Sequence, residues 1–201
     1  MFLPESSSWY FTALHSITLH FSKIAGLLKD HYDGKPTSEL HADIPSGTIT
    51  HGEKGVRSEP ITLPNHESTC YINGRFDIVI TFDDDSYGVV DFKTSNPHSD
   101  SSWMYSRQLH AYAYSLEHPA PGKLNLSPVT KLGLLYFYPD NINQQSIDRL
   151  NYSAEIVWKE VVKNEEKFLS FIDGVLSLLE LPEPPECSPT CRWCGYLEKI
   201  Q

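Results

Sequence analysis

The chain has 201 residues, of which 40% are hydrophobic and 21% charged, as is ordinary for one globular domain. Its 26 acidic residues outnumber its 16 basic residues, and the net charge of −10 argues against nonspecific attraction to nucleic acid. No apolar run approaches the roughly 18–20 residues that cross a membrane, and the N-terminus lacks a signal-peptide pattern. We therefore expect one domain over residues 1–201 that is soluble, cytoplasmic and not membrane-associated.

The first predicted element is a helix over residues 9–29, where apolar side chains recur at helical spacing. These side chains are Leu14, Ile17, Phe21, Ile24 and Leu28. Between residues 30 and 64 the composition turns polar, and glycines and prolines are frequent. We interpret residues 30–64 as a long polar loop.

Two strands are predicted next, over residues 71–82 and 86–94, with three consecutive aspartates between them. A tight turn would place Asp77 opposite Asp91, where two carboxylates repel unless a divalent cation lies between them. Lys93 would project from the same face, because side chains alternate along a strand. The apolar residues of both strands would share the other face: Phe76, Ile78, Ile80, Phe82, Val90 and Phe92. This pattern indicates a cation site, although a solvated sheet face would also explain it.

Three further elements follow along the chain. A helix over residues 102–117 would present Gln108 and Tyr112 on one face, because they are four residues apart. Residues 129–138 are rich in apolar and aromatic side chains, which predicts a buried strand beside the hairpin. A last helix is predicted over residues 154–181, and the prolines that follow would end it.

These motifs, taken in order, are specific enough to indicate a family. Gly-Arg-Phe-Asp at residues 74–77, Asp-Phe-Lys-Thr at residues 91–94, and then Gln108 and Tyr112 resemble the RecB-type branch of the PD-(D/E)XK nuclease superfamily. The resemblance extends to relatives from phages and from CRISPR adaptation. It implies an α/β fold with a restriction-endonuclease-like core, in which helices flank a mixed central β-sheet.

The resemblance also implies a metal-dependent nuclease, acting as an exonuclease on single-stranded DNA or DNA ends. Asp77, Asp91 and the backbone carbonyl of Phe92 would bind Mg²⁺ or Mn²⁺, since these cations prefer oxygen ligands. Lys93 would help to orient or deprotonate the attacking water, or would act as an electrostatic stabiliser. These groups would meet the two needs of phosphodiester hydrolysis, a nucleophilic water and neutralised phosphate charge.

Further site residues are implied by the same resemblance. Four of them would contact the nucleic-acid strand: Arg75, Thr94, Gln108 and Tyr112. Gln108 and Tyr112 would also steady the catalytic groups, although an ordinary helix face explains that pair when it is considered alone. A helical histidine would add a metal ligand, with His15 fitting the pattern better than His20. Glu59 resembles an acidic position of some relatives, but a loop carboxylate is the simpler interpretation.

The C-terminal tail, residues 182–201, holds three of the four cysteines: Cys187, Cys191 and Cys194. Such clustering in a cytoplasmic protein indicates a metal rather than disulfides. The resemblance implies an iron–sulfur cluster that uses one early cysteine, but this chain has no cysteine before Cys70. Zinc held with a histidine, and thiols that pack Trp193 against the core, therefore remain alternatives. Cys70 is expected to be a small core residue on the hairpin.

Two classes of function fit these observations. The first is a metal-dependent nuclease that binds DNA locally, aided by a protein partner. The second is a noncatalytic nucleic-acid-binding or assembly subunit with a degenerate nuclease fold, which the acidic composition and the incomplete cysteine set favour. The intact pair of Asp77 and Asp91 favours the nuclease.

Overall fold

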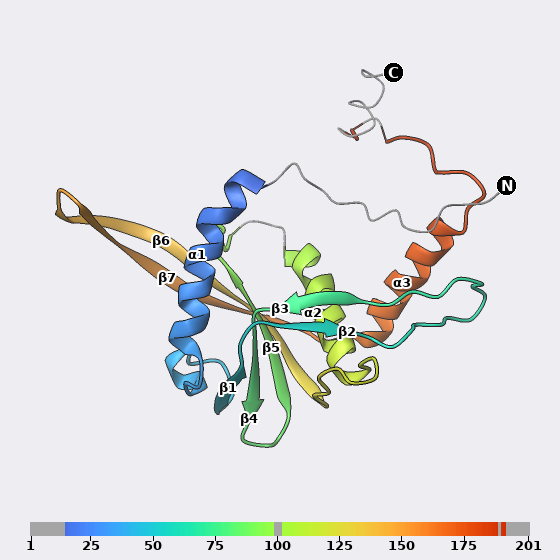
Figure 1. Cartoon of the computed structure of the whole chain (residues 1–201), viewed down its shortest axis with the longest axis horizontal. Coiled ribbons are helices and arrows are strands. Elements are labelled where there is room, and N and C mark those ends of the chain that lie inside the picture. The colour runs from blue at the N-terminus through green and yellow to red at the C-terminus, as the bar shows by residue number, and fades with distance from the viewer. Residues whose placement is uncertain (1–14, 99–101, 189, 192–201) are drawn as a thin grey trace.

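The computed structural model describes the backbone of residues 15–98, 102–188 and 190–191, and their side chains from residue 23 onward except 102 and 103. A mixed five-stranded sheet in the order β1-β4-β5-β6-β7 forms its centre (Figure 1). Its strands are β1 (Gly47–His51), β4 (Ile78–Phe82), β5 (Tyr87–Lys93), β6 (Val129–Ser146) and β7 (Arg149–Val161). A separate ribbon pairs β2 (Lys54–Arg57) with β3 (Asn73–Phe76). The helices are α1 (His15–Tyr32), the 3₁₀ turn η1 (Thr37–Glu39), α2 (Ser102–Glu117) and α3 (Glu165–Leu179).

The hairpin of β4 and β5 has the predicted antiparallel register. Ile78 lies opposite Val90, and Ile80 lies opposite Gly88. The other strand pairs of the sheet are antiparallel except β5 with β6, which run parallel. The predicted fold class, a mixed α/β sheet flanked by helices, is therefore confirmed.

Both faces of the sheet are buried at β4, β5 and the first half of β6, because side chains alternate along each strand and a helix covers each side. Residues of α1 and of the segment after it pack on one face: Tyr32, Leu40 and Ile44, with Ile78, Ile80, Val90, Phe92, Leu135 and Phe137. Residues of α2 pack on the other: Leu109, Ala113 and Leu116, with Val79, Val89, Leu132 and Leu134. A solvated face on the hairpin is therefore excluded.

The first predicted strand of the hairpin is interrupted at Asp77. Residues 73–76 form β3 in the small ribbon, and β4 begins only at Ile78. Side-chain alternation restarts at this bend, so Phe76 packs on the α2 face with Val79 instead of sharing the α1 face with Ile80. The prediction that placed Phe76 with the apolar residues of β4 was wrong for this reason.

The interpretation of residues 30–64 as a loop was also wrong. This segment contains η1, β1 and β2, and β1 forms an edge of the central sheet by pairing with β4. Several of its apolar side chains are buried: Leu40, Ile44, Ile49, Val56 and Ile61. They are spaced singly among glycines, prolines and polar residues, so no periodic pattern marked these short strands.

The predicted helix over residues 154–181 is in fact a strand followed by a helix. β7 pairs with β6 through Val161, and α3 begins after Asn164, whose side chain accepts a hydrogen bond from the Lys167 amide at 2.8 Å. Val157 and Val161 pack against the core from this strand. None of the described helices is long and apolar enough to cross a membrane.

Candidate functional site

Asp91 is a buried carboxylate on the α2 face of the sheet, 4% exposed. Its Oδ1 accepts a hydrogen bond from Gln108 Nε2 at 3.3 Å, and its Oδ2 contacts the ammonium of Lys93. That Oδ2 is buried and accepts no hydrogen bond of good geometry from the described residues. Burial raises the pKa of Asp91 to about 6; the ammonium of Lys93 opposes this rise, and the carboxylate of Asp77 adds to it.

Asp77 lies at the bend between β3 and β4, at the end of the sheet where β5 finishes. Its Oδ2 accepts a hydrogen bond from the backbone amide of Phe92 at 2.8 Å, so the bend is fixed to the end of β5. Its Oδ1 lies 2.7 Å from the Nζ of Lys29, near the C-terminus of α1. The antiparallel pairing of β4 and β5 thus brings both aspartates to one end of the sheet.

Gln108 links the charged groups of the site to one another. Its Oε1 accepts a hydrogen bond from Lys93 Nζ at 3.4 Å, and its Nε2 donates to the hydroxyl of Tyr112 at 2.8 Å. The ammonium of Lys93 also lies 4.0 Å from the ring centre of Tyr105, a cation–π contact. Gln108 of α2 therefore contacts both Asp91 and Lys93, and its bond to Tyr112 places these two residues on one face of the helix, as their spacing predicted.

Gly74 allows Tyr112 to approach the β2–β3 ribbon. A Cβ at this position would lie 2.8 Å from Cε1 of the Tyr112 ring, closer than such contacts occur. Tyr112 is 8% exposed, and burial raises the pKa of its phenol, so the hydroxyl stays protonated near neutral pH. The glycine of the Gly-Arg-Phe-Asp segment is thus explained by close packing against the site.

Lys29 and Glu53 contact the site residues but were not identified from the sequence. Glu53 Oε2 lies 2.7 Å from Lys29 Nζ, and its Oε1 accepts from Arg75 at 2.8 Å. Hydrogen bonds from Lys29 and Arg75 lower the pKa of Glu53. Burial alone would lower the pKa of Lys29, but hydrogen bonds to Asp77 and Glu53 outweigh it and raise the pKa. Neither residue belongs to a recognisable motif, and Glu53 lies in the segment interpreted as a loop.

The remaining predicted residues lie in several environments. Arg75 is largely exposed and pairs with Glu53, and Thr94 follows β5 directly. Glu59 is exposed, and its Oε1 lies 3.7 Å from Nδ1 of His118, so it is paired there, in line with a loop carboxylate. His15 is the first residue of α1 and His20 lies within it, but their side chains are outside the described part of the chain. The role of His15 stays a prediction.

The donor set around the two aspartates fits a hard divalent cation. The two carboxylates offer oxygen ligands, and Oδ2 of Asp91 lacks a hydrogen-bond donor of good geometry among the described residues. The backbone carbonyl of Phe92 stays a predicted ligand. No group of three or more His, Cys, Asp or Glu side chains able to hold a metal occurs among the described residues.

The structure describes three of the four cysteines, and Cys70 lies elsewhere than predicted. Cys70 is half-buried and forms an isolated antiparallel β-bridge with Ile61, outside the named strands. Its predicted placement on the hairpin was therefore wrong. Cys187 is exposed and Cys191 is half-buried, whereas Cys194 lies outside the described residues. A metal or cluster in the tail stays a prediction.

Comparison with known proteins identifies the family. The model of the PD-(D/E)XK nuclease superfamily matches residues 22–198, and the chain belongs to this superfamily. Enzymes of this superfamily are in general nucleases that use Mg²⁺ or Mn²⁺.

The solved structure of SSO0001 matches the chain with a TM-score of 0.45 and 15% identity, and the match covers 88% of this chain and 66% of that one. No curated protein matches the sequence significantly.

Proposed function

We propose that the protein is a RecB-type, metal-dependent nuclease that acts as an exonuclease on single-stranded DNA or DNA ends. Superfamily membership supports the nuclease chemistry, and the order of the sequence motifs supports the RecB-type branch. The observation that carries the proposal is the convergence of Asp77, Asp91 and Lys93 where β4 begins and β5 ends. Such a substrate is available in the cytoplasm, where we propose that the protein works.

The mechanism follows from the contacts of these side chains. Asp77, Asp91 and the carbonyl of Phe92 would hold Mg²⁺ or Mn²⁺, which when bound stabilises phosphate charge and makes a coordinated water more acidic. Lys93 is held beside Asp91 by Gln108, so its ammonium can orient the attacking water or stabilise the anionic transition state. Gln108 positions both charged groups, which limits the reorganisation that the reaction requires.

Residues at the rim of the site would bind the strand. The side chain of Arg75 is 68% exposed, which leaves its guanidinium accessible to a phosphate. Thr94 extends the same end of β5 and could donate its hydroxyl to the backbone of a strand. Gln108 and Tyr112 would contact the strand in addition to fixing the catalytic groups.

A noncatalytic nucleic-acid-binding or assembly subunit is the second candidate function. One contact favours it: Lys29 Nζ lies 2.7 Å from Oδ1 of Asp77, so the protein itself supplies a positive charge where a metal would bind. The net charge of −10 also opposes strand binding in the absence of a cation. An assay of cleavage distinguishes the two candidates.

The test is to incubate labelled single-stranded DNA, duplex DNA and RNA with the protein in Mg²⁺ or Mn²⁺. We expect cleavage of DNA by the parent protein and none by Asp91→Ala or Lys93→Ala. The matched controls are Asp83→Ala, in the exposed turn, and Lys123→Ala, on the surface. Circular dichroism would confirm that each variant folds.

Two outcomes would contradict the nuclease proposal. Cleavage that survives Asp91→Ala would arise from another site or from a contaminant. Binding of DNA without cleavage in either metal would favour the noncatalytic subunit.

A further inference from the structure

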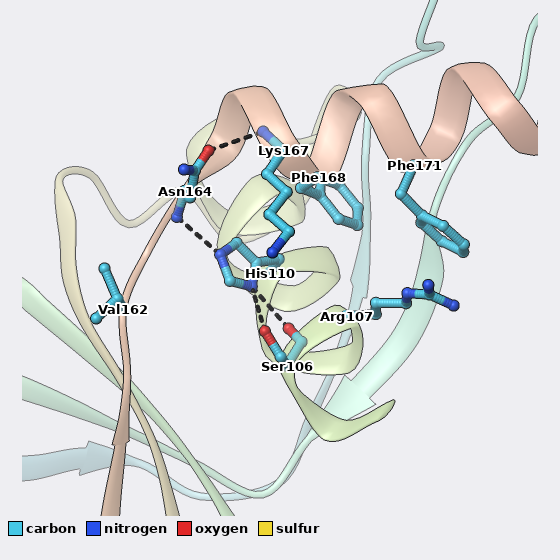
Figure 2. Close-up of a pocket in the computed structure, with 8 residues that line it drawn as sticks. All are labelled: Ser106, Arg107, His110, Val162, Asn164, Lys167, Phe168 and Phe171. Atoms are coloured by element: carbon cyan, nitrogen blue, oxygen red, sulfur yellow. Dashed lines mark hydrogen bonds between the residues drawn. The ribbon is translucent and has the colours of Figure 1, made fainter. Parts of the chain in front are cut away.

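A cavity of about 370 Å³ lies between α2 and the start of α3 (Figure 2), and Gln108 is not among the residues that line it. Cavities that bind small ligands have volumes of roughly 300–1,000 Å³, so this one could hold a group the size of one nucleotide. Arg107 and His110 line it from α2, and Lys167, Phe168 and Phe171 line it from α3. Two helices that are distant in the sequence therefore form its walls.

The charge of the cavity is opposite to that of the whole protein. Arg107 and Lys167 both line it, and no acidic side chain is among the described residues of its wall. Figure 2 shows Lys167 reaching from α3 toward His110, with Arg107 near Phe171. On a chain of net charge −10, a wall with two cations and no carboxylate favours an anionic ligand.

Aromatic rings and a hydrogen-bonded histidine make the wall rigid. His110 Nδ1 donates to the carbonyl of Ser106 at 2.7 Å, and its Nε2 accepts from the amide of Asn164 at 2.8 Å. The Phe168 ring stacks on His110, with centroids 6.1 Å apart and planes at 21°. The guanidinium of Arg107 lies 4.1 Å from the ring centre of Phe171. A ligand would thus enter a largely preformed site, which reduces the entropy lost on binding.

We infer that this cavity binds one nucleotide of a single-stranded nucleic acid, in addition to the contacts made at Asp77 and Asp91. The inference rests on the proposed function, because it assigns a second contact to the same substrate. Phe171 is half-exposed and Arg107 covers one face of its ring, so a base would stack on the other face, while Arg107 and Lys167 would bind the adjacent phosphate. Arg107 immediately precedes Gln108, so one helix would contact the strand both at the site and in the cavity.

The cavity favours a single strand over a duplex. A base can stack on a protein ring only after it leaves its own stack, which costs free energy in a duplex and little in a single strand. The cavity would therefore add affinity for single strands and for frayed ends, and little for intact duplex DNA.

Fluorescence anisotropy in EDTA measures this binding without cleavage. The probe is a labelled oligothymidylate, titrated with the parent, Lys167→Gln and the control Lys123→Gln, which changes the net charge equally. We expect Lys167→Gln to weaken binding several-fold and to reduce the slope of log affinity against log salt by about 0.7, the value for one phosphate contact of a single strand. Lys123→Gln should leave the slope unchanged.

A second pair of variants tests the stacking contact. Phe171→Leu keeps the apolar volume but removes the flat ring, so we expect about tenfold weaker binding of the oligonucleotide. Phe171→Tyr keeps the ring and should bind as the parent does. Duplex of the same length should bind all four variants of both pairs alike.

The outcomes separate this inference from the proposed function. Equal effects of Lys167→Gln and Lys123→Gln, or no difference between Phe171→Leu and Phe171→Tyr, would overturn the inference even if the protein cleaves DNA. Absence of any oligonucleotide binding by the parent would also overturn it. Thymidine monophosphate is the competitor. If Lys167→Gln weakens binding of this nucleotide but leaves binding of the oligonucleotide unchanged, the cavity takes a free nucleotide and the strand contact is refuted.

Discussion

Asp91 is an acidic residue in a buried position, and burial disfavours its ionised form. The folded protein raises its pKa from the usual 3.8 to about 6, and burial is the main cause. Between these two pH values the folded state binds a proton that the unfolded state releases. This group therefore costs the protein stability as pH rises from about 4 to 6, and the cost persists above pH 6.

Asp91→Asn should for this reason stabilise the metal-free protein near neutral pH. A shift of about 2 pKa units corresponds to about 3 kcal/mol at most, and asparagine cannot ionise. The variant should exceed the parent in free energy of unfolding above pH 6 and match it near pH 3.5. Urea denaturation in EDTA across this range is the measurement, with Asp83→Asn as the exposed control. A less stable variant at pH 7 would mean that the pair with Lys93 outweighs burial.

Lys29, like Lys93, is a cation of the protein that contacts a proposed metal ligand. Its Nζ lies 2.7 Å from both Asp77 Oδ1 and Glu53 Oε2, so a divalent cation that binds Asp77 meets a positive charge there. Lys29→Met removes this charge and keeps the length of the side chain. Repulsion between full charges at such distances is worth several kcal/mol even in a moderately polar environment.

We expect Lys29→Met to bind Mn²⁺ about tenfold more tightly, because the cation no longer competes with an ammonium. Isothermal titration calorimetry would measure the affinity directly. Lys35→Met serves as a control, since Lys35 pairs with Glu39 at 3.0 Å. Unchanged or weaker Mn²⁺ binding would show instead that Lys29 holds Asp77 in the geometry that the metal needs.

At the scale of the elements, helices and strands could be predicted from the sequence where a local residue pattern determines them. The helix over residues 102–117 and the register of β4 with β5 were both predicted, because helical spacing and alternation are local signals. The strand β7 was assigned to a helix because its apolar residues fit either period over a short span. Lys29 and Glu53 meet Asp77 through tertiary packing alone, so no local pattern indicated them.

The end of α3 is tied to the segment before the hairpin by His66. Its Nδ1 lies 2.8 Å from Glu180, and its Nε2 lies 2.8 Å from Asp173. Hydrogen bonds to Glu180 and Asp173 raise the pKa of His66, and His66 in turn is the main cause that lowers the pKa of Glu180 to about 2. Two segments that are distant in the sequence are therefore joined by a contact that depends on pH.

His66→Gln should destabilise the protein in a pH-dependent way. A histidine with a raised pKa contributes stability in full below about pH 6.5, its usual value, and loses it as pH rises through the folded pKa. Glu180 contributes above its usual pKa of 4.5 and loses this as pH falls toward 2. The difference in melting temperature between parent and variant should thus be largest between pH 4.5 and 6.5. A difference that is constant to pH 9 would mean that neutral hydrogen bonds account for the effect.

At the scale of the whole molecule, net charge and local charge differ in sign. The protein carries a charge of −10, yet Arg107 and Lys167 line a cavity without a described carboxylate. Charges separated by more than about 8 Å are largely screened at physiological salt, so a local cationic surface can act independently of the total. The acidic surface would then limit nonspecific binding and confine strand contact to the site and the cavity.

The outer part of the β6–β7 hairpin projects from the body of the molecule (Figure 1). Beyond Pro139 its side chains are exposed, including Ile142 at 66% and Ile147 at 92%. Burial of apolar surface supplies most of the stability of a fold, so this arm should contribute little to the free energy of unfolding. Its strands pair only with each other there, since Asn141 lies opposite Ser153.

Replacing residues 142–152 by an Asn-Gly turn should therefore leave the free energy of unfolding within about 1 kcal/mol of the parent, because Asn-Gly suits a two-residue hairpin. Leu134→Ala, at a fully buried position of the same strand, should by contrast cost about 2–5 kcal/mol. Urea denaturation of both variants gives the comparison. A shortened arm that destabilises as strongly as Leu134→Ala would show that the arm packs on another surface, because exposed side chains alone cannot account for such a loss.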